Sequence, residues 1–279
     1  MSLLITSLNS GSNGNCYYVG NEHDAVLVDA GISCRETEQR MANLGLSMDR
    51  VKAIFISHEH IDHIRGVRVL AKKYQLPVYI TPQTLTHSGL RLEKNLLYSF
   101  RENEPVFIGS LAVIPFVKLH DATDPYSFIV ESKGIKVGVI TDIGVACERV
   151  IHYFRQCHAC FLESNYDENM LEKGSYPMRL KKRIRGGKGH LSNVQALELF
   201  IKHKPAFMSH LLLSHLSENN NHPDLVSEMF SKHARETNII IASRNKETAV
   251  YEIEKTNDDE PVITFPQRRK AGLQMTMFN

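Results

Sequence analysis

Ser57-His58-Glu59-His60-Ile61-Asp62-His63 follows the apolar run 51–56, which is typical of a buried strand. Three histidines and an aspartate at the end of such a strand are difficult to explain by packing. Polar groups without partners cost several kcal/mol each when they leave water. A divalent cation removes that cost, and imidazole with carboxylate suits zinc, iron or manganese. The stretch therefore predicts a metal site at the end of a strand.

The rest of the chain is long and apolar enough to enclose this site. It has 279 residues, of which 42% are hydrophobic, and a formal net charge of +2. A charge this small does not indicate nucleic-acid binding by itself. No N-terminal apolar stretch has the length of a signal peptide or a membrane span, so we expect a cytoplasmic protein without membrane contact. We predict one domain over residues 1–255 and a C-terminal tail or closing segment over 256–279.

Short apolar runs alternate with helical patterns along the chain, which predicts an α/β fold. Ser33 and Glu36 form a capping-box pattern that opens a helix. The expected helices are 33–45, 64–74, 144–154, 192–203 and 224–234. The expected strands are 3–8, 16–19, 25–28, 51–56, 78–81, 106–108, 111–117, 127–130, 135–141, 159–163, 207–213, 239–242 and 250–253.

Four further polar side chains, Asp29, His120, Asp142 and His215, come directly after apolar runs. The ends of strands are where open sheets present functional groups. Without Asp29, these residues and the histidine cluster supply five histidines and two aspartates. That set of side chains is enough for two divalent metal ions that share a bridging ligand.

The chain carries the motif H-x-H-x-D-H, followed in order by a lone His, a lone Asp and a final His. In this order of residues it resembles the metallo-β-lactamase fold family. The resemblance implies an α/β (α+β) fold, an αββα sandwich of two mixed sheets flanked by helices. It also implies the ligand sets, with His58, His60 and His120 on one ion, Asp62, His63 and His215 on the other, Asp142 as the bridge, and Asp29 anchoring the histidine loop. Because His60 stands where oxygen-reducing di-iron members carry glutamate, the chain resembles the hydrolases.

Three later stretches resemble the nucleases of this superfamily. Residues 161–167 resemble the acidic motif of β-CASP nucleases, while 189–196 and 213–217 resemble segments of ribonuclease Z. Asp142 and His190 are only 48 positions apart, which leaves no room for a β-CASP insertion. The compact form resembles the YycJ (WalJ-like) family. This resemblance implies a 5′-to-3′ DNA exonuclease that acts in DNA repair.

A basic run precedes His190 and is expected to form a loop that contacts DNA. Glycines within it would let backbone N–H groups approach phosphate closely. A solvated face is the alternative for such a run. The candidate phosphate contacts are Arg179, Lys181, Lys182, Arg183, Arg185 and Lys188, together with Ser12, Asn13 and Ser192. A tight turn explains Ser12 and Asn13 equally well.

The expected reaction is phosphodiester hydrolysis by a hydroxide that bridges two ions. Asp62 would accept the proton of the attacking water. His190 would bind the scissile phosphate or protonate the leaving oxygen, with Glu163 orienting it. Three alternatives stay open at this point: a small-molecule thioesterase or lactonase resembling glyoxalase II, a ribonuclease, and a catalytically idle metal-bound regulator.

Overall fold

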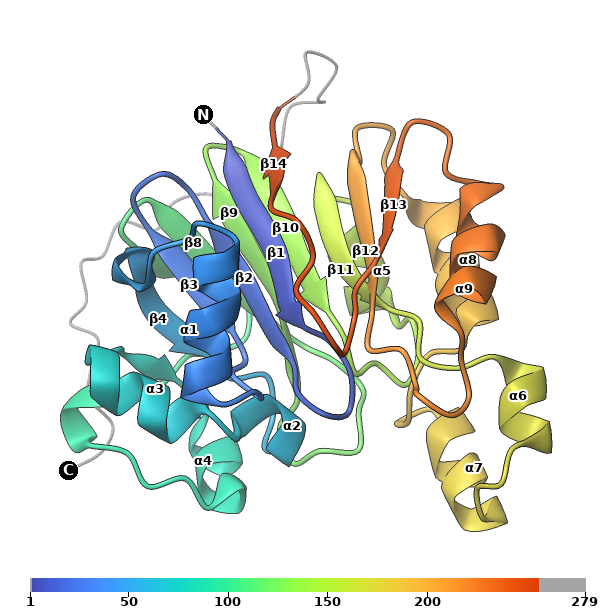
Figure 1. The fold of residues 1–279 in the computed structure, drawn as a ribbon, viewed down its shortest axis with the longest axis horizontal. Helices are drawn as coiled ribbons and strands as arrows, with labels where there is room; N and C mark the ends of the chain where they lie inside the picture. Colours follow the sequence, from blue (N-terminus) through green and yellow to red (C-terminus); the bar gives the residue numbers. More distant parts are fainter. Residues whose placement is uncertain (1, 256–279) are drawn as a thin grey trace.

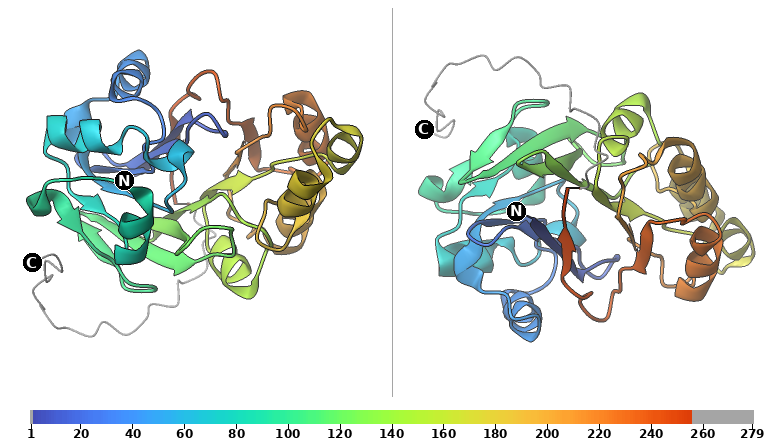
Figure 2. Two further views of the ribbon diagram at one scale, coloured as in Figure 1. Left: turned by 90° about the horizontal axis from the view of Figure 1, so that it is seen from below. Right: turned by 90° about the horizontal axis from the view of Figure 1, so that it is seen from above.

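Two β-sheets face each other in the centre of the molecule, and helices cover both outer faces (Figures 1 and 2). The structure is a computed structural model that describes residues 2–255. The predicted tail or closing segment, 256–279, therefore lies outside the described residues. The αββα sandwich predicted from the sequence is confirmed.

Both sheets are mixed and are built on the same plan. Within residues 2–255 each has seven strands, with antiparallel pairing at one end and parallel pairing at the other. The first sheet has the order β14 (Tyr251–Ile253), β1 (Leu3–Asn9), β2 (Cys16–Gly20), β3 (Ala25–Val28), β4 (Val51–Phe55), β5 (Val78–Tyr79) and β6 (Leu97–Tyr98). The second has the order β13 (Asn238–Ile241), β12 (His210–Ser214), β11 (Ala159–Glu163), β10 (Ile135–Ile140), β9 (Tyr126–Ser132), β8 (Leu111–Val117) and β7 (Val106–Ile108).

Strand β3, in the middle of the first sheet, is apolar at every position because both of its faces are buried. In β3, Val26 and Val28 point into the core between the sheets, whereas Ala25 and Leu27 pack under the outer helices. Successive side chains of a strand point to opposite faces, so one run supplies two cores. The apolar side chains on the outer face of each sheet must therefore be covered by a layer of helices.

The helices lie mainly in these two outer layers. α1 and α3 cover the first sheet, and α5, α8 and α9 cover the second (Figure 1). The capping box predicted at Ser33 and Glu36 is confirmed, since both of its hydrogen bonds are present. The helices are α1 (Cys34–Asn43), α2 (Ile61–Ile64), α3 (Val67–Tyr74), α4 (Pro82–Ser88), α5 (Glu148–Phe154), α6 (Glu168–Lys173), α7 (Met178–Arg185), α8 (Asn193–His203) and α9 (Pro223–Ser231), with 3-10 turns η1 (Met48–Arg50) and η2 (Lys94–Leu96).

The structure corrects the expected basic loop, because most of that run forms helix α7. The glycines that suggested a loop only end it, with Gly186 at its C-cap. Helices α4 and α6 are also absent from the sequence prediction. Among residues 2–255, no helix combines the length and the apolar character needed to cross a bilayer.

The parallel strands β10, β11 and β12 end at the same edge of the second sheet, and β4 of the first sheet leads into the loop before α2, at the lower side of the view (Figure 1). Asp29, Asp142 and His215 each follow a strand and have positive φ angles of 61°, 54° and 58°. Left-handed backbone is uncommon outside glycine and is associated with turns and functional sites. This edge is where the predicted ligands should meet.

Candidate metal centre and active site

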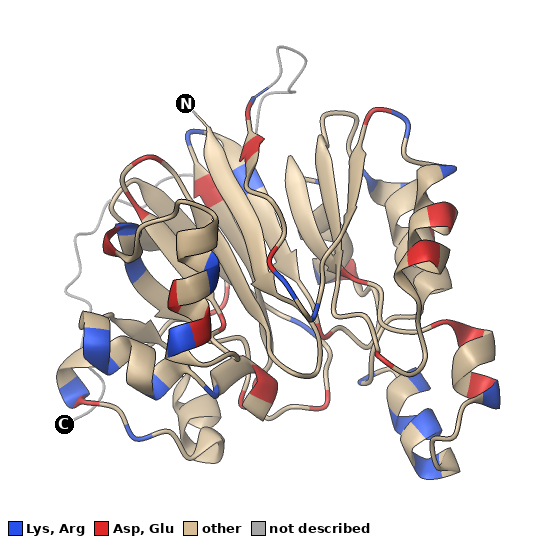
Figure 3. Ribbon diagram, viewed as in Figure 1, with Lys and Arg blue, Asp and Glu red and all other residues tan. Residues whose placement is uncertain are grey.

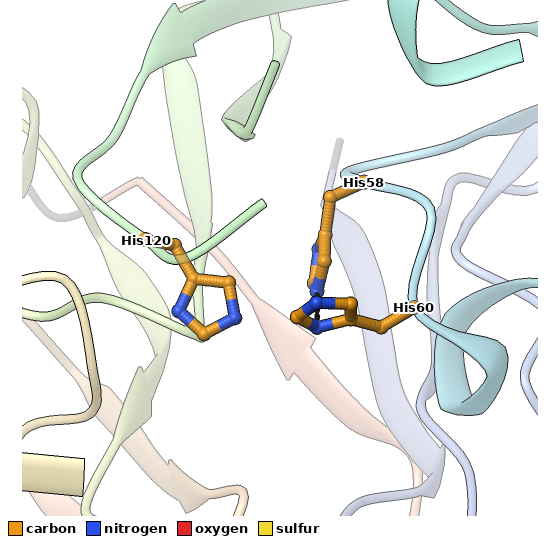
Figure 4. Close-up of side chains that lie close together, drawn as sticks. All are labelled: His58, His60 and His120. Atoms are coloured by element: carbon orange, nitrogen blue, oxygen red, sulfur yellow. Dashed lines mark hydrogen bonds between the residues drawn. The ribbon is translucent and has the colours of Figure 1, made fainter. Parts of the chain in front are cut away.

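His58, His60 and His120 form the first group of possible ligands (Figure 4). Nε2 of His58 lies 3.1 Å from Nδ1 of His60, and the ring centroids of His58 and His120 are 4.9 Å apart. Burial lowers the pKa of His58 well below its usual value and lowers the pKa of His120 to about 4. Neutral imidazoles at neutral pH leave their lone pairs available to a cation.

Asp62, His63 and His215 form the second group, and Asp142 lies between the two groups. Nε2 of both His63 and His215 lies close to Oδ2 of Asp62, at 3.6 and 3.5 Å. Asp142 Oδ2 is 3.3 Å from Nε2 of His63, while its Oδ1 is 3.5 Å from Nε2 of His215 and 3.9 Å from Nε2 of His120. Burial alone would raise the pKa of Asp142, but the charges of His215 and His63 hold it well below its usual range.

The geometry of both groups fits divalent metal ions. Within residues 2–255, Nε2 of His120, Nε2 of His215 and Oδ2 of Asp142 are buried and have no hydrogen-bond partner. Native proteins rarely leave such atoms unsatisfied without an ion or a water. Two ligands of a tetrahedral ion with bonds of about 2.0–2.1 Å lie ~3.3 Å apart, which is close to the separations between these nitrogens and carboxylate oxygens.

Asp29 holds the loop that carries the histidine cluster. Its carboxylate accepts hydrogen bonds from the backbone N–H and the hydroxyl of Ser57, both at 2.8 Å. Oδ2 of Asp29 also lies 2.7 Å from Nδ1 of His63. A proton on Nδ1 leaves the lone pair of Nε2 free to face the site, which is the usual arrangement of a metal-binding histidine.

Glu163 connects the second group to His190. Its Oε1 lies 2.7 Å from Nδ1 of His190 and 3.2 Å from Nδ1 of His215, while its Oε2 accepts from the backbone N–H groups of Ile143 and Leu191. Burial would raise the pKa of Glu163, yet the proximity of His190 lowers it to about 2. One buried carboxylate therefore orients both imidazoles and the strand end that carries Asp142.

Asn15 and Lys118 lie at the site, although the sequence interpretation did not single them out. Nδ2 of Asn15 is 3.2 Å from Oδ2 of Asp62, to which it can donate. Lys118 is buried and donates through Nζ to the carbonyl of Thr141, at 2.8 Å, directly before Asp142. Two features of the sequence could have indicated these residues: Asn15 stands immediately before an expected strand, and Lys118 extends an apolar run.

Two of the expected phosphate contacts are corrected. Lys181 is buried, and its ammonium donates to the carbonyl of Glu172, so it joins α7 to α6 instead of facing solvent. Ser192 is fully buried as the N-cap of α8, where its hydroxyl accepts from the N–H of Gln195 and donates to Glu168. A capping box explains that serine better than a ligand does.

The other expected contacts are at least partly accessible. Arg183 pairs with Asp121, next to His120, and Arg185 pairs with Glu172. Three cations have no ion-pair partner within the described residues and are exposed: Arg179, Lys182 and Lys188. Ser12 is exposed, whereas Asn13 is half-buried.

Metal binding is expected to release protons. Burial would lower the pKa of both His63 and His215, but nearby carboxylates, chiefly Asp142, raise both values, that of His215 strongly. Without metal these imidazoles therefore hold protons that an ion must displace, so affinity falls as pH falls, by up to about tenfold per pH unit for each proton. Calorimetric titration of metal-free protein with Zn²⁺ in buffers of different ionisation enthalpy measures the number released. Binding enthalpies that are the same in all buffers would show that metal binding releases no protons.

Comparisons with known proteins agree with this geometry. Residues 24–216 match the model of the beta-lactamase superfamily domain. The chain is 35% identical to the exodeoxyribonuclease YycJ of Bacillus anthracis over 81% of this chain and 86% of that protein. It is 33% identical to the exodeoxyribonuclease WalJ of Streptococcus pneumoniae over 78% and 83%.

Among solved structures, the metallo-beta-lactamase fold protein YhfI from Bacillus subtilis superposes with a TM-score of 0.69. It shares 17% identity and covers 90% of this chain and all of its own, so it supports the fold alone. The two exodeoxyribonucleases are more similar to this chain in sequence than YhfI is, and they align with it over most of their length. The chain therefore belongs to the beta-lactamase superfamily, and within it to the family of the exodeoxyribonucleases YycJ and WalJ.

Proposed function

We propose that the protein is a metal-dependent exonuclease that hydrolyses phosphodiester bonds of DNA from the 5′ end, in DNA repair. The observation that carries the proposal is the pairing of the buried Glu163 with His190 beside two groups of candidate metal ligands, in a chain whose relatives are named exodeoxyribonucleases. A small-molecule thioesterase or lactonase needs no such pair. A catalytically idle regulator is also disfavoured, because every expected ligand faces the site.

Two divalent ions, zinc, manganese or iron, are proposed for the two ligand groups. The first would be held by His58, His60 and His120, the second by Asp62, His63 and His215, with Asp142 shared. When bound, such ions supply an acidified water and neutralise the charge that develops on the phosphate.

The protein's own side chains are proposed to position the substrate and move protons. Oδ2 of Asp62 lies 3.6 Å from Nε2 of His63 and 3.5 Å from Nε2 of His215, and this carboxylate would accept the proton of the attacking water. His190 would bind the scissile phosphate or protonate the leaving oxygen through Nε2, because Glu163 occupies its Nδ1. Asn15 keeps the Asp62 carboxylate in place.

Helix α7 is proposed to contact the DNA backbone. Figure 3 shows several Lys and Arg positions along this helix. The ion pair of Arg183 with Asp121 ties the helix to the residue next to His120. Gly144, two residues after Asp142, packs against Gly187, since a Cβ on Gly144 would lie 2.4 Å from the Gly187 carbonyl. The exposed cations Arg179 and Lys182 of α7 therefore lie on a helix that is fixed to the site.

Replacing Arg179, Lys182 and Lys188 together by glutamine is expected to weaken DNA binding and to flatten its salt dependence. Each lost phosphate contact lowers the slope of log K against log salt by about 0.7 for single strands. Fluorescence anisotropy at several salt concentrations measures the slope. The matched control carries three glutamines on other surfaces, at Lys52, Lys202 and Lys232. If both triple variants keep the wild-type slope, neither α7 nor the turn that follows it touches DNA.

The function is tested with protein loaded with Mn²⁺ or Zn²⁺. We expect release of nucleotides from linear 5′-phosphorylated DNA, and loss of the release on addition of a chelator. RNA of the same sequence and a glutathione thioester are run in parallel. Faster cleavage of RNA would make the protein a ribonuclease, and activity on the thioester alone would overturn the proposal.

A further inference from the structure

A polar turn between β1 and β2, residues 10–15, reaches from the second ligand group to the surface. At its inner end the Ser10 hydroxyl accepts from the backbone N–H of His215 at 2.7 Å, and Asn15 lies beside Asp62. At its outer end Ser12 is exposed. Gly11 and Gly14 have φ angles of +147° and +157°, which only glycine adopts readily, so the turn is sharp. One end of this turn is thus fixed at the site and the other is open to solvent.

Two arginines flank this turn through Asn13. Nη1 of Arg65 donates to the carbonyl of Asn13 at 3.0 Å, and the amide of Asn13 donates to the carbonyl of Arg244 at 2.8 Å. Gly11 lies directly against Arg244, because a Cβ at Gly11 would be 3.2 Å from Cβ of Arg244. Within residues 2–255, the exposed Arg65 has no carboxylate partner. The guanidinium of Arg65 and the backbone of Arg244 therefore both contact the turn that carries Ser12 and Asn13.

The side chain of Arg244 is 18% exposed and forms an ion pair with an acid at the surface. Its Nη1 lies 3.1 Å from Oε2 of Glu218 but makes no hydrogen bond of good geometry within the described residues, although that nitrogen is buried. Glu218 is 64% exposed, so its carboxylate is free to turn toward water. A stronger and more highly charged acceptor would displace it. A phosphomonoester, with a charge of about −1.5 to −2 and three acceptor oxygens, is such a group.

We propose that Arg65, Arg244 and Ser12 bind the 5′-terminal phosphate of the DNA strand. The inference rests on the proposed nuclease function and explains how the enzyme would recognise an end. Guanidinium groups bind phosphate through paired N–H donors. From Ser12 to Asn15 is three residues, which span at most about 10 Å. The terminal phosphate then lies only one or two nucleotides from the bond that is cut.

The position of α7 agrees with this assignment. α7 is tied to Asp121 and packs near Gly144, on the His120 side of the ligands, whereas Arg65 and Arg244 lie on the Asp62 and His215 side. A strand with its 5′ end at Ser12 and its following phosphates along α7 must cross both ligand groups. Hydrolysis would then release short 5′-phosphorylated products, one or two nucleotides long.

The test compares kcat/KM for one DNA sequence with a 5′-phosphate or a 5′-hydroxyl. We expect the wild type to prefer the phosphate. Arg65→Gln and Arg244→Gln should each reduce kcat/KM for the phosphorylated strand by roughly tenfold or more, because hydrogen bonds to charged groups are lost, and leave the hydroxyl strand within about twofold. Glu218→Gln should raise the preference by a few fold, since it removes the competing acid. Arg68→Gln, an exposed arginine on α3, is the control and should change neither value.

The opposite signs expected for Arg244→Gln and Glu218→Gln keep the proposal testable even if one variant folds poorly. An unchanged preference in the arginine variants, or a lower preference in Glu218→Gln, overturns the phosphate site. Wild-type protein that cleaves both strands equally overturns it as well and leaves the nuclease function intact. Protein that cleaves neither strand overturns the nuclease function, and this inference with it.

Discussion

Asp142→Asn is expected to give a folded protein that retains little metal and hydrolyses no phosphodiester. Asp142 is the carboxylate that faces both groups of ligands, with oxygens 3.3–3.9 Å from the nitrogens of His63, His215 and His120. The amide keeps the shape but loses the charge and one acceptor oxygen. Losing even an outer partner of a ligand costs about 10–100-fold in metal affinity, so losing a shared ligand should cost more. His58→Ala should have the same double effect.

Elemental analysis after dialysis measures the metal, and nucleotide release measures the activity. Asp224→Asn, at a 93% exposed side chain on α9, is the control and should change neither quantity. A variant of Asp142 with full metal content and normal activity would show that this carboxylate is not a ligand.

His190→Ala is expected to separate catalysis from metal binding. Its ring contacts His120 and stacks on His215, and its Nδ1 is held by Glu163, but it belongs to neither of the two principal ligand sets. We expect kcat to fall by about 10²–10⁴-fold, the usual contribution of a positioned acid or base, with metal content unchanged. Full activity in this variant would remove its assigned role.

Glu163→Gln makes the comparison more informative. Because Glu163 also orients His215, its loss should reduce both activity and metal content, unlike the loss of His190. His233→Ala, an exposed histidine remote from the ligand cluster, serves as the control for histidine removal. Equal metal content in the Glu163 and His190 variants would mean that Glu163 acts on His190 alone.

The positions of the candidate metal ligands were predictable because strand ends are local features of the sequence. An apolar run ending in Asp or His identifies a side chain at a sheet edge, and parallel strands place such ends together. The run Leu211–Leu213 before His215 and the run before Asp142 both follow this rule. The apolar runs predicted an α/β fold, whereas the αββα layer order was implied by the resemblance to the metallo-β-lactamase fold family.

The surroundings of the site were less predictable because they depend on partners distant in sequence. Lys181 is a buried cation only because the carbonyl of Glu172 meets its ammonium, and Ser192 is a cap only because a helix starts after it. Asn15 reaches Asp62 across 47 positions of sequence. Composition describes residue types, but these roles arise from tertiary contacts that a local pattern does not contain.

The left-handed backbone at Asp29, Asp142 and His215 has a consequence for how this protein evolves. Such a conformation costs roughly 1–2 kcal/mol at a non-glycine residue, so glycine at any of the three would relieve strain. Mutation toward a more stable fold would therefore tend to erase the site, as in other proteins that exchange stability for activity. With all three side chains present, the fold is less stable by this backbone strain than it would be with glycine at these positions.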